Sequence, residues 1–380
     1  MKLYQYILSG AMSMGLLFSS CSDWLDVTPV DTRTTENFYT TPSQMEQALI
    51  GVYNGLLPLS TYALLMSEVR SDNTWCGELS TAQRDYMDIS SFNPNISTIA
   101  TVRDAWNDLF EIVSRANLFL SKVDGVNYTI EGIKEQQIGE ARFLRALAYF
   151  DLVRYYGRVP LTLVPQTISE AMSTPQSEAV VNLKSKNNCF LLMFNRADYQ
   201  RRESASGRAR LTAAKALLGR VYLTMAGFPL YDETKKELAR ELLEEVIDYA
   251  DATGKFWAKN ASEWQRMWIN ENDNKYHIFE IQYIVAKDYG NPMVFHSVPR
   301  LPSKYVTLEM SGNSIACAKG LDNLLKEEQD EEGHFLDVRC LATIDTTKFV
   351  NDDNPNSVTK YAGEDFFIKF LEHKMKREAL

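Results

Sequence analysis

The sequence lacks the short motifs that mark common cofactor and catalytic sites. It contains no GxGxxG, no Walker A phosphate loop, no HExxH and no GxSxG. Its four histidines are widely separated, so none has the spacing of a metal-ligand cluster. Adjacent carboxylates such as Glu244 and Glu245 stand in charged helical stretches, where solvation explains them. The sequence therefore predicts no enzyme activity, no cofactor and no metal site, although two distant carboxylates that flank one bond would escape this reading.

Cysteine and positive charge are also scarce. The 50 Asp and Glu residues outnumber the 40 Lys and Arg residues, and the formal net charge is -10. Phosphate binding needs concentrated Lys and Arg, so this balance argues against nucleic acid as a partner. Four of the five cysteines are scattered without CxxC spacing, which indicates buried residues and no disulfide framework. These are Cys76, Cys189, Cys317 and Cys340.

The remaining cysteine, Cys21, ends a short apolar run. Lys2 precedes apolar residues 7–18, a run that is too short to span a bilayer and is typical of a secretory signal. The residues Leu17-Phe18-Ser19-Ser20-Cys21 resemble a bacterial lipobox, in which the signal is cut before a cysteine that then carries lipid. We expect a signal peptide over 1–20, lipid on Cys21 and a tether over 21–40. An ordinary signal peptide with an incidental cysteine is the alternative. No later run approaches about 20 apolar residues, so no transmembrane helix is expected.

Helical periodicity dominates residues 41–255. The longest helix is predicted over 134–160, where two neighbouring apolar stripes indicate burial against more than one helix. Gly157 and Pro160 provide its stop signal. Four further helices are predicted. The first begins at Pro42 or Ser43 and ends at Leu57, with Ser43 as its cap and Glu46 three residues later. The others span 102–123, 212–226, capped by Thr212, and 235–250.

The helix over 212–226 contains Leu218-Gly219-Arg220-Val221-Tyr222, the L-G-x-x-Y core of a tetratricopeptide repeat. Gly219 would let the paired helix approach closely, and Ala239 and Leu243 would face it. A regular 34-residue period is absent, which favours divergent helix pairs. Residues 276–285, YHIFEIQYIV, are rich in strand-forming residues. The predicted fold is mainly α, with tetratricopeptide-like helix pairs and an irregular, loop-rich second part containing short strands.

Residues 67–95 have loop composition but include Trp75, Tyr86 and Phe92. A sugar ring stacks its apolar face on an aromatic ring, while its hydroxyls pair with Asp, Asn and Arg side chains. This loop supplies that mixture near Arg70, and the alternative is that Trp75 only caps the core. The candidate ligand-binding residues are Asp72, Asn73, Trp75, Arg84, Tyr283 and Tyr289.

Four segments appear in a characteristic order: CSDWLD at 21–26, RDAWNDLFEIVSRANLFL at 103–120, GEARFLRALAYFDLVRYYGRVPL at 139–161 and RLTAAKALLGRVYLTMAG at 210–227. Together they resemble the SusD/RagB family of outer-membrane nutrient-binding lipoproteins of Bacteroidetes. The resemblance implies a mostly helical, lipid-anchored protein displayed at the cell surface, with glycan ligands and ligand sites built partly from the region of the 72–84 loop. It also implies a partner, a SusC-like TonB-dependent transporter barrel over which the lipoprotein closes.

The sequence departs from that family in two places. Residues 178–202 have poor helical period where the family has an amphipathic helix, which is typical of a local frame shift or a divergent insertion. The sequence ends at LEHKMKREAL, where the family continues with a further helix. We therefore expect a single domain over 41–380, with a helical core at 41–255 and a truncated irregular part at 256–380.

Three functions compete on the sequence alone. A cell-surface glycan-binding transport lipoprotein is the leading hypothesis, and an exposed aromatic platform would favour it. A protein-scaffold repeat module would show a bare concave groove. A glycoside-active enzyme would show two facing buried carboxylates.

Overall fold

The computed structural model describes the helical part of the chain and several short later segments. These residues are 38–71, 74–75, 84–93, 99–167, 169–170, 207–228, 230–269, 275–284, 316–317, 329–331, 344–345 and 366–367. The expected signal peptide, residues 21–37 of the expected tether, the segment 178–202 and the C-terminal end lie outside them. The expected domain limits therefore stay predictions.

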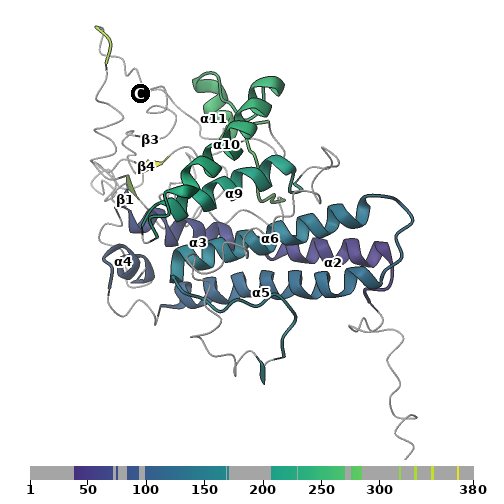
Figure 1. The fold of residues 1–380 in the computed structure, drawn as a ribbon. Coiled ribbons are helices and arrows are strands. Elements are labelled where there is room, and N and C mark those ends of the chain that lie inside the picture. The colour runs from purple at the N-terminus through teal and green to yellow at the C-terminus, as the bar shows by residue number, and fades with distance from the viewer. Residues whose placement is uncertain are drawn as a thin grey trace, which may run out of the picture.

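Three helices form the main layer of the core: α2 (Pro42–Asn54), α5 (Ala100–Lys122) and α6 (Ile133–Tyr156). Figure 1 shows them lying side by side. α2 buries Met45, Leu49 and Val52, and α5 buries a longer stripe that includes Leu109 and Phe119. These apolar residues recur every three or four positions, so one face of each helix is removed from water. A short 3-10 helix, η5 (Val123–Gly125), follows α5.

α6 is the helix that the sequence predicted over 134–160, and the prediction is confirmed. Both of its apolar stripes are used: Leu144 and Leu152 on one and Phe143 and Phe150 on the other are buried. It contacts α2, α5 and α9 (Leu211–Ala226), so it has more than one neighbour, as a helix with two apolar stripes requires. It ends at Gly157, whose φ of 75° is a conformation that residues with side chains rarely adopt.

α9 and α10 (Thr234–Thr253) form a closely packed helix pair joined by the turn at 227–233. At Gly219 a Cβ atom would lie 2.8 Å from Cγ of Leu243, which is closer than packed carbon atoms approach. The predicted role of Gly219 is therefore confirmed, because a Cβ atom there would collide with the Leu243 side chain of the paired helix. Ala239 is buried on the same side of α10. α11 (Ala261–Ile269) follows and was not expected from the sequence.

A second, smaller core lies beside the main one. It joins α3 (Leu59–Met66), the 3-10 helix η2 (Glu68–Arg70) and α4 (Arg84–Ser90) through buried apolar side chains. The sequence predicted a loop over 67–95, and η2 and α4 within it are corrections. Both are short, and helices of this length are stabilised by tertiary packing more than by the helix propensity of their residues. The buried members are Leu65, Val69, Tyr86, Ile89 and Ile99.

Residues 42–70 together are long and apolar enough to pass a length-and-composition test for a membrane-spanning helix. This stretch contains α2, α3 and η2, and turn residues separate α2 from α3 at 55–58. Leu49 and Val52 are fully buried in the protein core. Its apolar character is therefore explained by packing.

Two local predictions are wrong. α2 is capped by Thr41 and not by Ser43: Thr41 accepts from the backbone N–H of Gln44, whose side chain accepts from the Thr41 N–H. Pro42 suits the first helical position, which places the cap one residue before it. Residues 276–284 form no strand. Ile278, Phe279 and Ile281 instead pack against the helical core, and this burial replaces pairing with another strand.

Four two-residue strands form one small sheet: β1 (Thr74–Trp75), β2 (Ala316–Cys317), β3 (Ile344–Asp345) and β4 (Phe366–Phe367). Their order is β1-β2-β4-β3, and every neighbouring pair is antiparallel. The short strands of the second part are thereby confirmed. The sheet brings the loop after η2 beside residues from the C-terminal third of the chain.

Candidate functional site

The loop predicted to bind ligand is held at both ends. Its first end follows η2, where Val69 is buried and the backbone N–H of Ser71 donates to the Glu68 carbonyl at 2.9 Å. Its other end enters α4, where Tyr86 and Ile89 are buried in the second core. The residues at which this loop begins and ends thus belong to a packed core, which is the kind of support that a binding loop needs.

Within this loop, Trp75 lies in β1, where its backbone is paired with Ala316. Arg84 is the first residue of α4. Asp72 and Asn73 lie outside the described residues, as do Tyr289 and the lipid-attachment candidate Cys21. The structure thus places the backbone of two predicted site residues at the same loop, and the ligand-binding role of all of them stays a prediction.

The three aromatic residues of the loop region have different environments. Tyr86 is buried in the second core, so its role is structural. Phe92, just after α4, is 62% exposed, and its backbone has a φ of 54°. The guanidinium carbon of Arg70 lies 5.9 Å from the centre of the Phe92 ring. An exposed ring beside a hydrogen-bond donor is a suitable surface for a sugar, and the sequence identified Phe92 only as an aromatic residue in a loop.

Tyr283 has a different setting from the loop. Its hydroxyl donates to the Leu57 carbonyl at 2.7 Å, just before α3, and burial raises the pKa of the phenol. Trp75 follows η2, beyond the other end of α3, and an eight-residue helix is about 12 Å long. Tyr283 therefore anchors residues 275–284 to the helical core, and it approaches α3 from the end opposite to Trp75.

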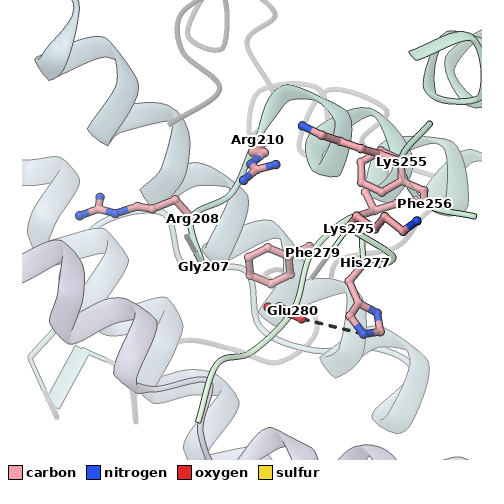
Figure 2. A pocket seen from close by; sticks show the side chains of 10 residues that line it. Gly207, Arg208, Arg210, Lys255, Phe256, Lys275, His277, Phe279 and Glu280 are labelled. Carbon is pink, nitrogen blue, oxygen red and sulfur yellow. Dashed lines mark ion pairs between the residues drawn. The ribbon is translucent and has the colours of Figure 1, made fainter. Parts of the chain in front are cut away.

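Two adjoining cavities lie on either side of residues 207–208. One has a volume of 320 Å³ between the end of α2 and residues 280–284, and its lining includes Tyr53, Leu57 and Ile284. The other has a volume of 190 Å³ and is shown in Figure 2. Both are lined by Gly207, Arg208 and Glu280. The sequence did not predict either cavity, because the segments that form them are far apart in the chain.

Arg208 is held by two carboxylates from the main core. One guanidinium nitrogen donates to Glu140 on α6 at 3.0 Å, and the other donates to Glu46 on α2. Tyr53 donates its hydroxyl to Glu140 at 2.7 Å and accepts from the Ala209 backbone N–H at 2.9 Å. These contacts fix the segment that leads into α9. Gly207 precedes it with a φ of 76°, a conformation that favours glycine.

Burial dominates the electrostatics of this network. It raises the pKa of Glu140, while hydrogen bonds from Tyr53 and Gln136 act in the opposite direction. Burial also lowers the pKa of the Arg208 guanidinium. Two carboxylates that converge on one point would suit glycoside chemistry, but here both contact Arg208 and neither lines either cavity. The arrangement is that of a structural ion-pair network.

Metal binding has no support in the described part of the chain, where no three His, Cys, Asp or Glu residues are grouped as metal ligands. The features that remain in the described part are the exposed ring of Phe92 and two cavities with polar and aromatic linings.

A SusD-like family model, described as "Starch-binding associating with outer membrane", matches residues 23–223. The chain belongs to this SusD-like family. A SusD-like protein of Bacteroides ovatus is 27% identical over 244 residues, which are 61% of this chain and 42% of the relative. SusD-like protein P25 of Formosa agariphila is 30% identical over 164 residues, or 41% of this chain and 31% of the relative. These matches span less than half the length of each relative.

Solved SusD-like structures have the same fold. A SusD homologue from Bacteroides thetaiotaomicron is 19% identical with a TM-score of 0.60, covering 89% of this chain and 69% of the other. A laminarin-binding SusD-like protein is 22% identical with a TM-score of 0.60, covering 87% and 72%. NanU of B. fragilis is 17% identical with a TM-score of 0.62, covering 89% and 68%. The mainly helical, tetratricopeptide-like fold expected from the sequence is therefore confirmed.

Proposed function

We propose that this protein is a cell-surface lipoprotein that captures an oligosaccharide and passes it to a SusC-like TonB-dependent transporter in the outer membrane. Membership of a family described as starch-binding and associated with the outer membrane is the observation that carries the proposal. The laminarin-binding relative supports glycans as the ligand class.

The 71–84 loop is the proposed contact surface for the sugar. Trp75 would stack on the apolar face of a sugar ring, with Asp72, Asn73 and Arg84 pairing with its hydroxyls. Phe92 and Arg70 extend this surface at the edge of the loop, since the ring is exposed and the guanidinium lies beside it. Tyr289 stays in the proposal as a sugar contact from a second part of the chain. Tyr283, whose hydroxyl donates to the Leu57 carbonyl, is instead expected to anchor residues 275–284 to the helical core.

We expect the protein to bind sugar without cleaving it. Glu46 and Glu140 both contact Arg208 and neither lines a cavity, which supports a structural role for this pair and not the flanking of a glycosidic bond.

The direct test is titration calorimetry of wild type and Trp75→Ala with malto-oligosaccharides and laminari-oligosaccharides, followed by chromatography of the sugars after long incubation. Removing one stacked ring should weaken binding by about 1 kcal/mol, or roughly fivefold in Kd. Phe228→Ala is the matched control, because it removes another exposed ring from the turn between α9 and α10. Equal binding by wild type and Trp75→Ala would move the site away from the loop, and shortened sugars would refute the non-catalytic assignment.

A further inference from the structure

The chain just after α4 carries an exposed aromatic ring beside an arginine. Phe92, two residues after α4, is 62% exposed, so its ring is open to a ligand. Arg70 is the last residue of η2, and its guanidinium carbon lies 5.9 Å from the centre of the Phe92 ring. That distance is typical of a cation–π contact. We call Phe92, Arg70 and the neighbouring Tyr155 of α6 the Phe92 surface.

Tyr155 joins this surface to the main core. Burial raises the pKa of its phenol and the charge of Arg70 acts in the opposite direction, so Arg70 lies near enough to interact with it. The guanidinium carbon of Arg154 lies 5.7 Å from the centre of the Tyr155 ring and 5.4 Å from that of the Phe150 ring. Arg154 is itself paired with Asp151 at 2.9 Å. These contacts fix Tyr155 at the end of α6, beside Arg70.

Arg70 can donate hydrogen bonds to a ligand. No carboxylate in the described part of the chain forms an ion pair with it. A guanidinium group is planar and carries five N–H donors at its edge, so a contact with a ring face leaves those donors available. A sugar presents an apolar ring face together with hydroxyl groups. An exposed phenylalanine beside an arginine matches both features.

The second core holds both members of this pair in place. Val69 directly precedes Arg70 and is 1% exposed, and Ile89 of α4 is fully buried. The backbone N–H of Phe92 donates to the Ile89 carbonyl at 3.3 Å. Side chains that are fixed before binding lose little conformational freedom when a ligand arrives. The Phe92 surface therefore stands on a packed support.

η2 also connects this surface to the 71–84 loop. It contacts α4 and it contacts β1, the strand that contains Trp75. Arg70 and Trp75 are five positions apart, so their Cα atoms are separated by at most about 18 Å. The proposed contact surface of the loop is thus close enough to the Phe92 surface for one oligosaccharide chain to reach both.

We propose that the Phe92 surface is a separate subsite for a further sugar residue of the same chain, with Phe92 stacked on the ring and Arg70 donating to its hydroxyls. This inference rests on the proposed glycan-binding function and specifies that the ligand is a chain of several sugar residues, bound along its length. Phe92 is exposed and does not close a pocket, so a chain can continue past it. Tyr155 positions Arg70 from the side of α6.

The test compares probes that differ only in chain length. Calorimetric titration measures Kd for laminaribiose and laminarihexaose, and for maltose and maltohexaose as a second pair. The Kd of the disaccharide divided by that of the hexasaccharide is the length ratio. For wild type we expect a length ratio of at least about fivefold, because the longer chain gains one further aromatic contact.

Matched variants assign this gain to the subsite. Phe92→Ala should lower the length ratio about fivefold, and Phe92→Tyr should retain it because the ring is kept. Arg70→Lys should also lower it, since lysine keeps the charge but loses the planar set of donors. The controls are Phe228→Ala, which removes an exposed ring elsewhere, and Arg240→Lys on the exposed face of α10. Circular dichroism and thermal midpoints establish that each variant is folded.

Each result either supports or overturns the inference. The same length ratio in wild type and Phe92→Ala would overturn it, as would an equal fall in Phe228→Ala. A purely structural role for the ring would lower the thermal midpoint of Phe92→Ala without changing the length ratio, which overturns the subsite as well. If Trp75→Ala weakens binding of both sugars while Phe92→Ala keeps the wild-type ratio, only this inference fails. If no sugar of any length binds, the proposed function fails with it.

Discussion

The ion-pair network around Arg208 provides a quantitative test of the core. The Arg208→Met variant replaces the guanidinium side chain with an uncharged one. Glu140 then keeps its hydrogen bonds from Tyr53 and Gln136 but loses its cationic partner. The Glu140 side chain is 1% exposed and that of Arg208 is 18% exposed. Breaking a buried pair from one side costs about 3–5 kcal/mol. Because Arg208 retains some contact with water and two donors remain, we expect a loss of about 2–3 kcal/mol in the free energy of unfolding at pH 7.

The loss should depend on pH in a defined direction. Burial raises the pKa of Glu140 above its ordinary value of 4.5, so the folded state binds this proton more tightly than the unfolded state. Such a group stabilises the folded state increasingly as the pH falls, and that contribution is lost as the pH rises through the folded pKa. Removing the Arg208 charge raises this pKa further. The deficit of Arg208→Met should therefore be largest at pH 7 and smaller at pH 5.

Urea unfolding at the two pH values measures both effects. Adding Glu140→Gln to Arg208→Met removes the uncompensated charge, so the double variant should be more stable than Arg208→Met alone at pH 7. Arg240→Met is the matched control, because Arg240 pairs with Glu237 and Glu244 on the exposed face of α10. An equal deficit at pH 5 and pH 7, or a double variant that shows the full sum of both losses, would refute this account of the network.

The remaining predictions concern the buried helix and the membrane anchor. Leu144→Ala should destabilise the protein by about 2–5 kcal/mol, because Leu144 is fully buried. Leu147→Ala should cost less, because Leu147 is only partly buried. Equal thermal midpoints in both variants and wild type would contradict the packing of α6. Cys21→Ala should move the protein from the membrane fraction to the soluble fraction after cell lysis, and a variant that stays with membranes would exclude lipid on Cys21.

The main helices were predictable because their apolar periods are long and uninterrupted. α5 and α6 were placed within a few residues of their observed ends, and Gly157 ended α6 as expected. The close approach of α9 and α10 was also predictable, because Gly219 stands in a pattern whose spacing has a direct packing meaning. In each case the information is local to one helix or one helix pair.

The features that were predicted wrongly or missed all depend on residues that lie far away in the chain. Residues 276–284 have the composition of a strand, but composition does not reveal that the helical core, and not another strand, would cover Phe279 and Ile281. The short helices η2 and α4 have too few residues for a periodic signal and form around Val69 and Tyr86 in the second core. Trp75 was found as a loop residue, whereas its pairing with Ala316 joins positions far apart in the chain.

The charged residues of α6 show how a distant feature can still be recognised from sequence. A helix that is apolar on two stripes is buried nearly all round, so a charged residue at a buried position must have a partner. Arg145 meets this requirement by donating to Asn117 at 2.7 Å and to the Leu163 carbonyl at 3.3 Å, which fixes the chain after α6. Glu140 meets it through Arg208, which fixes the segment that lines both cavities. Glu140 is therefore a sequence signal that a distant cation packs against α6, whereas the identity of that cation and the cavities beside it depend on the fold.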